Sequence, residues 1–313
     1  MQFYNTDQTI KALPAEQLIA AIEHLFIQGC DVPLRHNHAI QNGNNEEVGR
    51  FLIMPAWQPG RRLGLKTVSI FPNNNQQGLA GLHSVYILYD ANTGVPIAIF
   101  DGNTITSRRT AAASALAARF LSRPDSHRLL VVGAGQVGRL LPEMYKAVRP
   151  IEEVSIFNPT LVNAEMLADK LTQDGFKVQI VKDLKAAVSQ ADIISCATLS
   201  TKPLIMRDWL QPGQHLDLIG SFSPEMRETD GKCFADTSVF MDTEEALMKA
   251  GDILSAIKEG YFDQNKNLGT LYNLCRSQCQ GRTSKNEITV FKSVGTGLED
   301  LAAANLAYDN LNQ

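Results

Sequence analysis

A glycine-rich turn between an apolar strand and a helix is the feature that most limits what this chain can fold into. The turn comprises Gly133, Ala134, Gly135, Gln136, Val137 and Gly138. It follows the apolar run 129–132 and precedes a helix-like stretch, and a second strand candidate begins about 20 residues further on. Glycines in this setting let backbone N–H groups approach a pyrophosphate. The pattern predicts a dinucleotide-binding turn in which residues 133–137 contact the cofactor.

Strand-like and helix-like segments alternate on both sides of this turn. The strand candidates are 129–132, 152–157, 177–181, 192–198, 215–220 and 238–243, and helix-like stretches such as 163–171 and 183–190 lie between them. This alternation is typical of a parallel sheet with helices on both faces. We therefore predict an α/β fold in which residues 110–289 form a Rossmann dinucleotide-binding domain.

The first hundred residues have a different pattern. Short β-branched and aromatic runs at 48–57, 63–72, 83–90 and 95–102 predict strands, and the turn residues 90–94 predict a hairpin between the last two. An amphipathic helix is expected at 14–28, and another strand and helix are expected at the end of the chain. With 313 residues the chain is long enough for a second, strand-rich domain.

Composition excludes several classes of protein. The chain has 29 Lys and Arg against 33 Asp and Glu, so it lacks the basic excess expected of a nucleic-acid-binding protein. No apolar run is long enough to span a membrane, so we expect no membrane association. The five cysteines are scattered, and the spacing of Cys275 and Cys279 suits a helix face better than a metal site. We predict a cytoplasmic protein with reduced thiols and no metal.

The residues after the second Rossmann strand bear on the choice of cofactor. An NAD-specific site usually offers Asp or Glu to the ribose hydroxyls there, whereas this chain has Asn158, Pro159 and Thr160. Asn158 and Thr160 can hydrogen-bond a 2′-phosphate without repelling it. NADPH is therefore favoured, with NADH as the alternative, although no arginine lies in this loop.

Three cations precede the glycine-rich turn: Arg35, Lys66 and Arg109. Lys66 interrupts an apolar strand, where an unpaired ammonium is costly. Arg109 begins a helix whose next residues are small. Guanidinium groups clamp carboxylates bidentately, and a lysine adds a charge that can also donate a proton.

The chain resembles the ornithine cyclodeaminase/mu-crystallin family in four blocks that occur in the family's order. The blocks are GLKTVSIFPNN, FDGNTITSRRTAAASALAA, VVGAGQVGR and FKSVGTGLEDLAAANLAY. The resemblance implies a Rossmann domain inserted into a strand-rich α+β domain that binds substrate and forms a homodimer. On this basis we place residues 1–109 and 290–313 in that outer domain.

The resemblance also implies roles for individual residues. The positions that match Arg35, Lys66 and Arg109 bind the substrate carboxylate beside the nicotinamide. Thr110 matches a residue near the cofactor phosphate, and the segment 293–295, including Val294, matches one near the nicotinamide. We also assign Ser221 to the cofactor site.

One departure from the family separates its activities. Ornithine cyclodeaminases carry an aspartate in a GGDxPGKTE-like loop, but this chain reads GSFSPEMRE at 220–228, with Phe222 in the aspartate's place. Without that carboxylate, deprotonation of an amine and attack of water on an imine lose their base. The loop is similar to that of the family's ketimine reductases, and an apolar ring there helps exclude water.

We therefore predict an NAD(P)H-dependent reductase of cyclic imino acids. It would convert Δ1-pyrroline-2-carboxylate to L-proline and also Δ1-piperideine-2-carboxylate to L-pipecolate, with Lys66 and Arg109 as the catalytic residues. The alternatives are an ornithine cyclodeaminase, which releases ammonia, and a non-catalytic protein that binds NADPH and a small carboxylate. Alanine dehydrogenase-like activity on pyruvate and ammonia is a further alternative.

Overall fold

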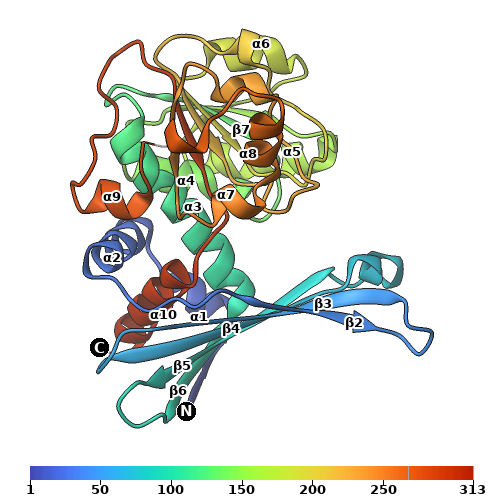
Figure 1. Cartoon of the computed structure of the whole chain (residues 1–313), viewed down its shortest axis with the longest axis vertical. Coiled ribbons are helices and arrows are strands. Elements are labelled where there is room, and N and C mark those ends of the chain that lie inside the picture. The colour runs from blue at the N-terminus through green and yellow to red at the C-terminus, as the bar shows by residue number, and fades with distance from the viewer. Residues whose placement is uncertain (267, 313) are drawn as a thin grey trace. The chain divides into compact units, whose positions relative to one another are not determined.

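The chain forms two compact units in a computed structural model that describes residues 1–266 and 268–312 (Figure 1). The first unit contains Met1–Arg109 and the chain from Thr296 onward, and the second contains Thr110–Gly295. Asn267 and Gln313 fall within the predicted domain ranges but lie outside the described residues. Among the helices that the structure describes, none combines the length and apolar content needed to cross a membrane.

The first unit is built on a six-stranded sheet with the order β1-β6-β5-β4-β3-β2. Its strands are β1 (Gln2–Tyr4), β2 (His36–Gln41), β3 (Glu47–Trp57), β4 (Arg62–Ile70), β5 (Leu82–Asp90) and β6 (Pro96–Asp101). All neighbours are antiparallel except β1 and β6. The predicted hairpin at 90–94 joins β5 to β6. The sequence did not reveal β1 or the fully exposed, polar β2.

Helices cover one face of this sheet (Figure 1). α1 (Thr6–Lys11) and α10 (Gly297–Leu311) pack against the strands, and α2 (Ala15–Gln28) packs on α10. The apolar stripe of α2 is buried, as its spacing predicted, and α10 packs against both α2 and the central strands. The covered face includes Met54, Lys66, Val68, Tyr86 and Phe100, all almost fully buried.

The second unit is built on a seven-stranded parallel sheet with the order β12-β13-β11-β10-β7-β8-β9. Its strands are β7 (Arg128–Val132), β8 (Glu153–Phe157), β9 (Lys177–Ile180), β10 (Ile193–Cys196), β11 (His215–Leu218), β12 (Ser238–Met241) and β13 (Thr289–Lys292). The central strands are buried along their length, as expected of a sheet covered on both faces. The order reverses at β7, between β8 and β10, which is the switch point of a Rossmann fold.

The helices of the second unit connect these strands. They are α4 (Leu141–Lys146), α5 (Leu161–Gln173), α6 (Leu184–Gln190), α7 (Ala246–Lys249), α8 (Gly251–Lys258) and α9 (Leu271–Cys275), and α3 (Gly102–Leu121) continues into this unit from the first. The 3₁₀ helices of the chain are η1 (Pro72–Gln77), η2 (Gly138–Leu140), η3 (Arg207–Trp209), η4 (Gly231–Phe234) and η5 (Gln264–Lys266). The predicted fold class, a Rossmann domain inserted in a strand-rich α+β domain, is confirmed.

The chain returns to the first unit later than the sequence suggested. We expected residues 290–313 in the outer domain, but β13 pairs with β11 and β12 in the Rossmann sheet. The return therefore begins at Thr296. A strand-like run identifies a strand but not its partners, and this strand completes the parallel sheet.

Candidate active site

The three glycines of the turn after β7 have different physical reasons to be there. Gly133 has a φ of 104°, and a Cβ there would lie 2.6 Å from the carbonyl oxygen of Ala197. A Cβ on Gly138 would lie 1.9 Å from the carbonyl oxygen of Gly133. A Cβ on Gly135 would meet no atom within 4 Å, so packing does not require that glycine. Its open side is the cradle that a pyrophosphate approaching the backbone would fill.

The backbone donors of the turn also fit an anionic group. No acceptor for the N–H groups of Gly135 and Gln136 is found among the described residues. The helix that follows is shorter than its sequence suggested, because η2 precedes α4 and Pro142 lies in the first turn of α4. A six-residue helix adds little dipole. The N–H groups of the turn would therefore provide most of the attraction for a pyrophosphate.

Asn158, at the end of β8, braces the turn. Its Oδ1 accepts the N–H of Ala134 at 3.0 Å, and its Nδ2 donates to the carbonyl of Thr160 at 2.8 Å. Both polar atoms of the Asn158 side chain thus make hydrogen bonds to the protein backbone. Thr160, in contrast, is exposed, and its hydroxyl does not cap α5. Arg139, which the sequence reasoning missed, donates from Nε to the carbonyl of Ala134 at 3.2 Å. The guanidinium of Arg139 and the amide of Asn158 therefore both contact the backbone of Ala134.

The loops after β10 and β11 lie against one another at the carboxyl edge of the sheet. Ser221 is fully buried, and its hydroxyl donates to the carbonyl of Met226 and accepts the N–H of Asp252, each at 2.8 Å. The Ser221 hydroxyl therefore holds the loop 220–228 together, and the contact of Ser221 with the cofactor stays a prediction. Phe222 is 46% exposed, so the clamped loop presents its ring to solvent.

The segment after β13 is fixed by an acid that the sequence did not single out. Asp242, at the end of β12, accepts the N–H groups of Val294 at 2.7 Å and Gly295 at 2.6 Å with its Oδ2. Val294 is itself nearly buried. Asp242 thus fixes the backbone of the segment that the family resemblance places near the nicotinamide.

In the first unit, Lys66 and Arg109 meet at one buried carboxylate. The Nζ of Lys66 on β4 lies 2.6 Å from Oδ2 of Asp300, and the Nε of Arg109 on α3 lies 2.8 Å from Oδ1 of the same residue. Nη1 of Arg109 also donates to Glu299. No acceptor for its Nη2 is found among the described residues. The arrangement leaves one end of the guanidinium able to bind a ligand.

The charges of this cluster shift one another's pKa values. The pKa of Lys66 is lowered to about 8, chiefly because burial disfavours its charge; Asp300 opposes this shift, and Arg109 and Arg35 add to it. Burial disfavours the charge of Asp300 as well, but Arg109 and Lys66 outweigh burial and lower its pKa. Arg35 is half-buried and near enough to act on the pKa of Lys66. The three predicted cations therefore share one electrostatic environment.

Glu299 and Asp300 are functional candidates that sequence reasoning missed. Both lie in the first turn of α10 and are fully buried. Acidic residues are common in the first turn of an exposed helix, where they complement its dipole, so their position gave no sign of burial. The available signal was the block FKSVGTGLEDLAAANLAY, which contains both residues.

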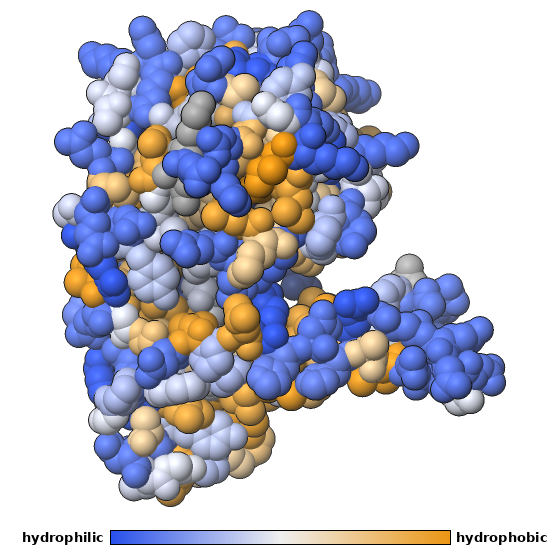
Figure 2. Space-filling model, in the orientation of Figure 1, coloured by the Kyte–Doolittle hydropathy of each residue, from blue (hydrophilic) through white to orange (hydrophobic). Residues whose placement is uncertain are grey.

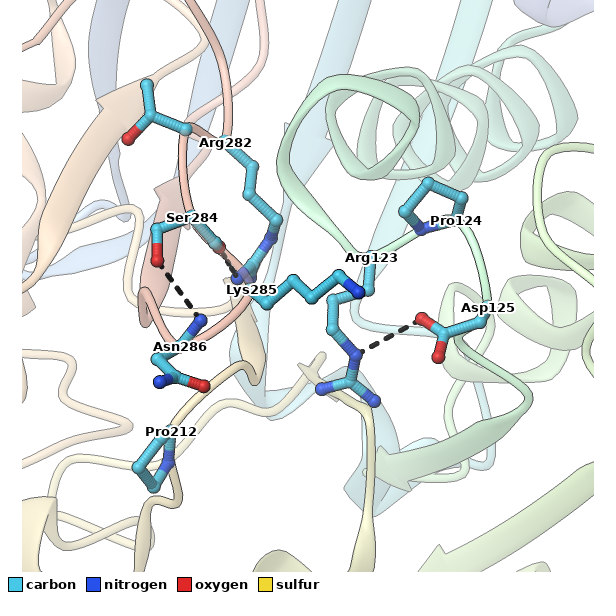
Figure 3. Close-up of a pocket in the computed structure, with 9 residues that line it drawn as sticks. Arg123, Pro124, Asp125, Pro212, Arg282, Ser284, Lys285 and Asn286 are labelled. Carbon is cyan, nitrogen blue, oxygen red and sulfur yellow. Dashed lines mark hydrogen bonds and ion pairs between the residues drawn. The ribbon is translucent and has the colours of Figure 1, made fainter.

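A cavity of about 770 Å³ lies at the opposite, amino-terminal edge of the Rossmann sheet (Figure 3). It is lined by Arg123, Pro124, Asp125, Pro212, Arg282, Thr283, Ser284, Lys285 and Asn286, from segments that precede β7, β11 and β13. Arg123 donates to Asp192 and to the carbonyl of Gly213, and Arg282 donates mainly to backbone carbonyls. These arginines tie the loops together. Dinucleotides bind at the carboxyl edge, so we do not place the cofactor here.

Comparisons with known proteins agree with this geometry. A model of the ornithine cyclodeaminase/mu-crystallin family matches residues 7–313. The chain is 38% identical over 282 residues to the Δ1-pyrroline-2-carboxylate reductase of Paracoccus denitrificans, covering 87% of this chain and 89% of that protein. It is also similar to the solved structure of the Thermococcus litoralis Δ1-pyrroline-2-carboxylate reductase in complex with NADH and L-proline, with a TM-score of 0.92, 29% identity, and coverage of 100% of this chain and 98% of that one.

An archaeal alanine dehydrogenase dimer with bound NAD is another similar structure. It has a TM-score of 0.91 and 26% identity, and the match covers 99% of this chain and 95% of that one. The family model spans nearly the whole chain, and the four sequence blocks lie in the elements just described. The chain therefore belongs to the ornithine cyclodeaminase/mu-crystallin family.

Proposed function

We propose that this protein is an NAD(P)H-dependent reductase of cyclic imino acids, which converts Δ1-pyrroline-2-carboxylate to L-proline and its six-membered homologue to L-pipecolate. The observation that carries the proposal is the pairing of Lys66 and Arg109 on Asp300, with the Nη2 of Arg109 left for a carboxylate. The second unit supplies a cradle that fits a dinucleotide. Relatives named as Δ1-pyrroline-2-carboxylate reductases support the substrate class.

The residues of the first unit would bind and orient the substrate. Arg109 donates from Nη2 to the carboxylate, and Arg35 adds a second cation. Because Asp300 holds both Lys66 and Arg109, the two cations keep fixed positions when the substrate is absent. Fixed positions reduce the entropy lost when the substrate is oriented for reaction.

Lys66 is the proposed proton donor. A reduced nicotinamide, when bound, supplies the hydride to the imine carbon, and the imine nitrogen must gain a proton to become the secondary amine of the product. A buried lysine with a pKa of about 8 releases a proton more readily than a solvated one. Phe222 would help to keep water from the imine, so that reduction competes with hydrolysis.

For the cofactor we propose a preference for NADPH, with NADH also accepted. No carboxylate follows β8 to repel a 2′-phosphate, and Thr160 offers an exposed hydroxyl there. Arg139 supplies the cation that the loop 158–160 lacks, since its guanidinium is anchored at Ala134. The N–H groups of Gly135 and Gln136 would bind the pyrophosphate, while Thr110 and Val294 keep the cofactor contacts that the family implies.

We further propose that the protein is a cytoplasmic homodimer. The six-stranded sheet has an apolar face opposite α10, which includes Ile53, Leu65, Val85, Ile87 and Ile99. Val85 is 42% exposed, and apolar side chains gather along this sheet in Figure 2. A second copy with the same face would bury both. Light scattering should give twice the chain mass, and Ile87→Glu should give the monomer; a monomeric parent protein would refute the proposal.

A cofactor-oxidation screen against cyclic imines and α-keto acids tests the proposed function. We expect NADPH and NADH oxidation that depends on Δ1-pyrroline-2-carboxylate. Ammonia release from ornithine without net change of the cofactor would identify a cyclodeaminase instead. Tight binding of NADPH and a small carboxylate, with no oxidation across the panel, would identify a binding protein. Oxidation only with pyruvate and ammonia would identify an alanine dehydrogenase.

A further inference from the structure

We propose that Glu228 is a positioning residue that holds the cofactor-binding edge of the Rossmann sheet in its binding conformation. Glu228 is fully buried, and it has no part in the proposed imine reduction. The inference rests on the proposed function for its choice of ligand, a nicotinamide dinucleotide. Glu228 belongs neither to the glycine-rich turn nor to the group of Arg35, Lys66 and Arg109, so the inference adds a residue to the proposed site.

The carboxylate of Glu228 joins two loops. Its Oε1 accepts the N–H of Thr198 at 2.7 Å and the Oγ1 hydroxyl of the same residue at 2.8 Å, and its Oε2 accepts the N–H of Gly220 at 2.7 Å. Thr198 follows β10, and Gly220 follows β11. One side chain therefore fixes the positions of both loops relative to each other. Neither a shorter acid nor an amide could accept all three donors in the same way.

These loops lie next to the glycine-rich turn. A Cβ on Gly133 would lie 2.6 Å from the carbonyl oxygen of Ala197 and 3.1 Å from Cγ2 of Thr198, so the turn and the loop after β10 are in close contact. A Cβ on Gly220 would lie 2.3 Å from the carbonyl oxygen of Thr198. Because the strand order reverses at β7 and β10 is its neighbour, these contacts form the floor on which a dinucleotide would rest.

Each of the two loops presents an exposed apolar side chain. Leu199 follows Thr198 and is 78% exposed, and Phe222 follows Gly220 by two residues and is 46% exposed. Exposed apolar side chains at the rim of a Rossmann sheet are suited to contact the flat rings of a bound cofactor or substrate. Glu228 thus sets the separation of two side chains that the cofactor site would use.

A second buried acid holds Glu228 in place. Oδ1 of Asp252 accepts the backbone N–H groups of Glu228 at 2.8 Å and Thr229 at 3.0 Å. Lys292 is fully buried on β13, and its Nζ lies 3.7 Å from Oδ2 of Asp252. Burial raises the pKa of Glu228 to about 8, and the charge of Lys292 opposes this rise. Lys292 therefore offsets part of the cost of burying this carboxyl group beside Asp252.

The test compares Glu228→Gln with Glu287→Gln. Glu287 is the control, because it also accepts two backbone N–H groups, from Thr283 and Ser284. It accepts hydroxyls as well, from Ser238 and Thr283, but at the amino edge of the same sheet. Both variants should lower the melting temperature. Leaving the N–H of Gly220 without its buried acceptor should raise the Kd of Glu228→Gln for NADPH by about tenfold or more. The Kd of Glu287→Gln should equal that of the parent protein.

Binding is measured by the fluorescence of NADPH alone, so the result does not depend on imine reduction. If the parent protein binds NADPH but reduces no imine, the proposed function fails and the inference about Glu228 stands. An unchanged Kd in Glu228→Gln, or an equal loss in Glu287→Gln, would overturn the inference. If Glu228→Gln does not fold, Thr198→Val and Thr198→Ser are compared instead. The valine variant loses the Oγ1 donor to Glu228 and should bind NADPH less tightly than the serine variant, which keeps a hydroxyl. Equal affinities of the two variants for NADPH would overturn the proposal.

Discussion

Replacing Asp300 with asparagine removes a carboxylate that contacts both Lys66 and Arg109. The ammonium of Lys66 lies 2.6 Å from Oδ2 of Asp300, and both side chains are almost fully buried. Removing one partner of a buried ion pair costs about 3–5 kcal/mol. We take a third of this cost as the loss of stabilisation of the charged form of Lys66. One pKa unit corresponds to about 1.4 kcal/mol, so the pKa of Lys66 should drop by about one unit.

The assay is the pH dependence of kcat/KM for Δ1-pyrroline-2-carboxylate. The proposed mechanism needs protonated Lys66, whose pKa is about 8, so activity of the parent protein should fall as the pH rises through that value. In Asp300→Asn the fall should occur about one pH unit lower. Titration of the substrate itself is the same for both proteins and cannot produce the difference.

Glu299→Gln is the control for this experiment. Glu299 contacts Arg109, whereas the ion pair of Lys66 is with Asp300. The control should reduce kcat/KM while leaving the alkaline fall near pH 8. If the fall occurs at the same pH in Asp300→Asn as in the parent protein, Lys66 is not the group that titrates, and its role as proton donor is wrong.

Four further predictions concern other parts of the chain. Arg109→Ala should lower kcat/KM by about 100-fold or more, because a buried charge contact with the carboxylate is lost, and near-normal turnover at low substrate would contradict its role. Gly135→Ala should have the melting temperature of the parent protein, since its Cβ meets open space, but should bind NADPH weakly in a fluorescence titration. Gly138→Ala should lower the melting temperature, since its Cβ would lie 1.9 Å from a carbonyl oxygen. The reverse pattern would refute the assignment of the cradle. Arg139→Met should reduce the NADPH-to-NADH ratio of kcat/KM by roughly tenfold, from the loss of a charged hydrogen bond, and an unchanged ratio would remove Arg139 from the site. Burial, with neighbouring Arg282 and Arg149, lowers the pKa of His215 from 6.5 to about 3. Below pH 6.5 the unfolded chain therefore binds the proton first, and the free energy of unfolding falls with acidification. Between pH 7 and about pH 4, denaturant unfolding should show that His215→Gln loses roughly 3 kcal/mol less of this free energy than the parent protein, and an equal loss in both proteins would contradict this.

The sequence was most informative where side chains follow a period or a turn requires glycine. The β-branched runs of the parallel sheet and the glycines at 133 and 138 are fixed by burial and close backbone contact, and both were predicted. The polar strand β2 could not be found this way, because it is fully exposed and has no alternation. The partners of β13 could not be found either, since pairing depends on contacts distant in sequence.

The buried charges were the main omission. Glu299 and Asp300 look like surface acids at a helix start, and Glu228, Asp252 and Lys292 each look solvated when taken singly. Their burial depends on partners from other elements, as Asp300 on α10 depends on β4 and α3. Lys66 was recognised because it interrupts an apolar strand. The sequence therefore located one member of a buried ion pair, and the structure was needed to find the other.

Transfer of an isotopic label tests the central claim most directly. The protein is incubated with Δ1-pyrroline-2-carboxylate and NADPH that carries deuterium at the transferable position of the nicotinamide, and the product is analysed by mass spectrometry and NMR. The account predicts L-proline with one deuterium at Cα for each cofactor oxidised. Proline without deuterium, or cofactor oxidation without proline, would contradict it.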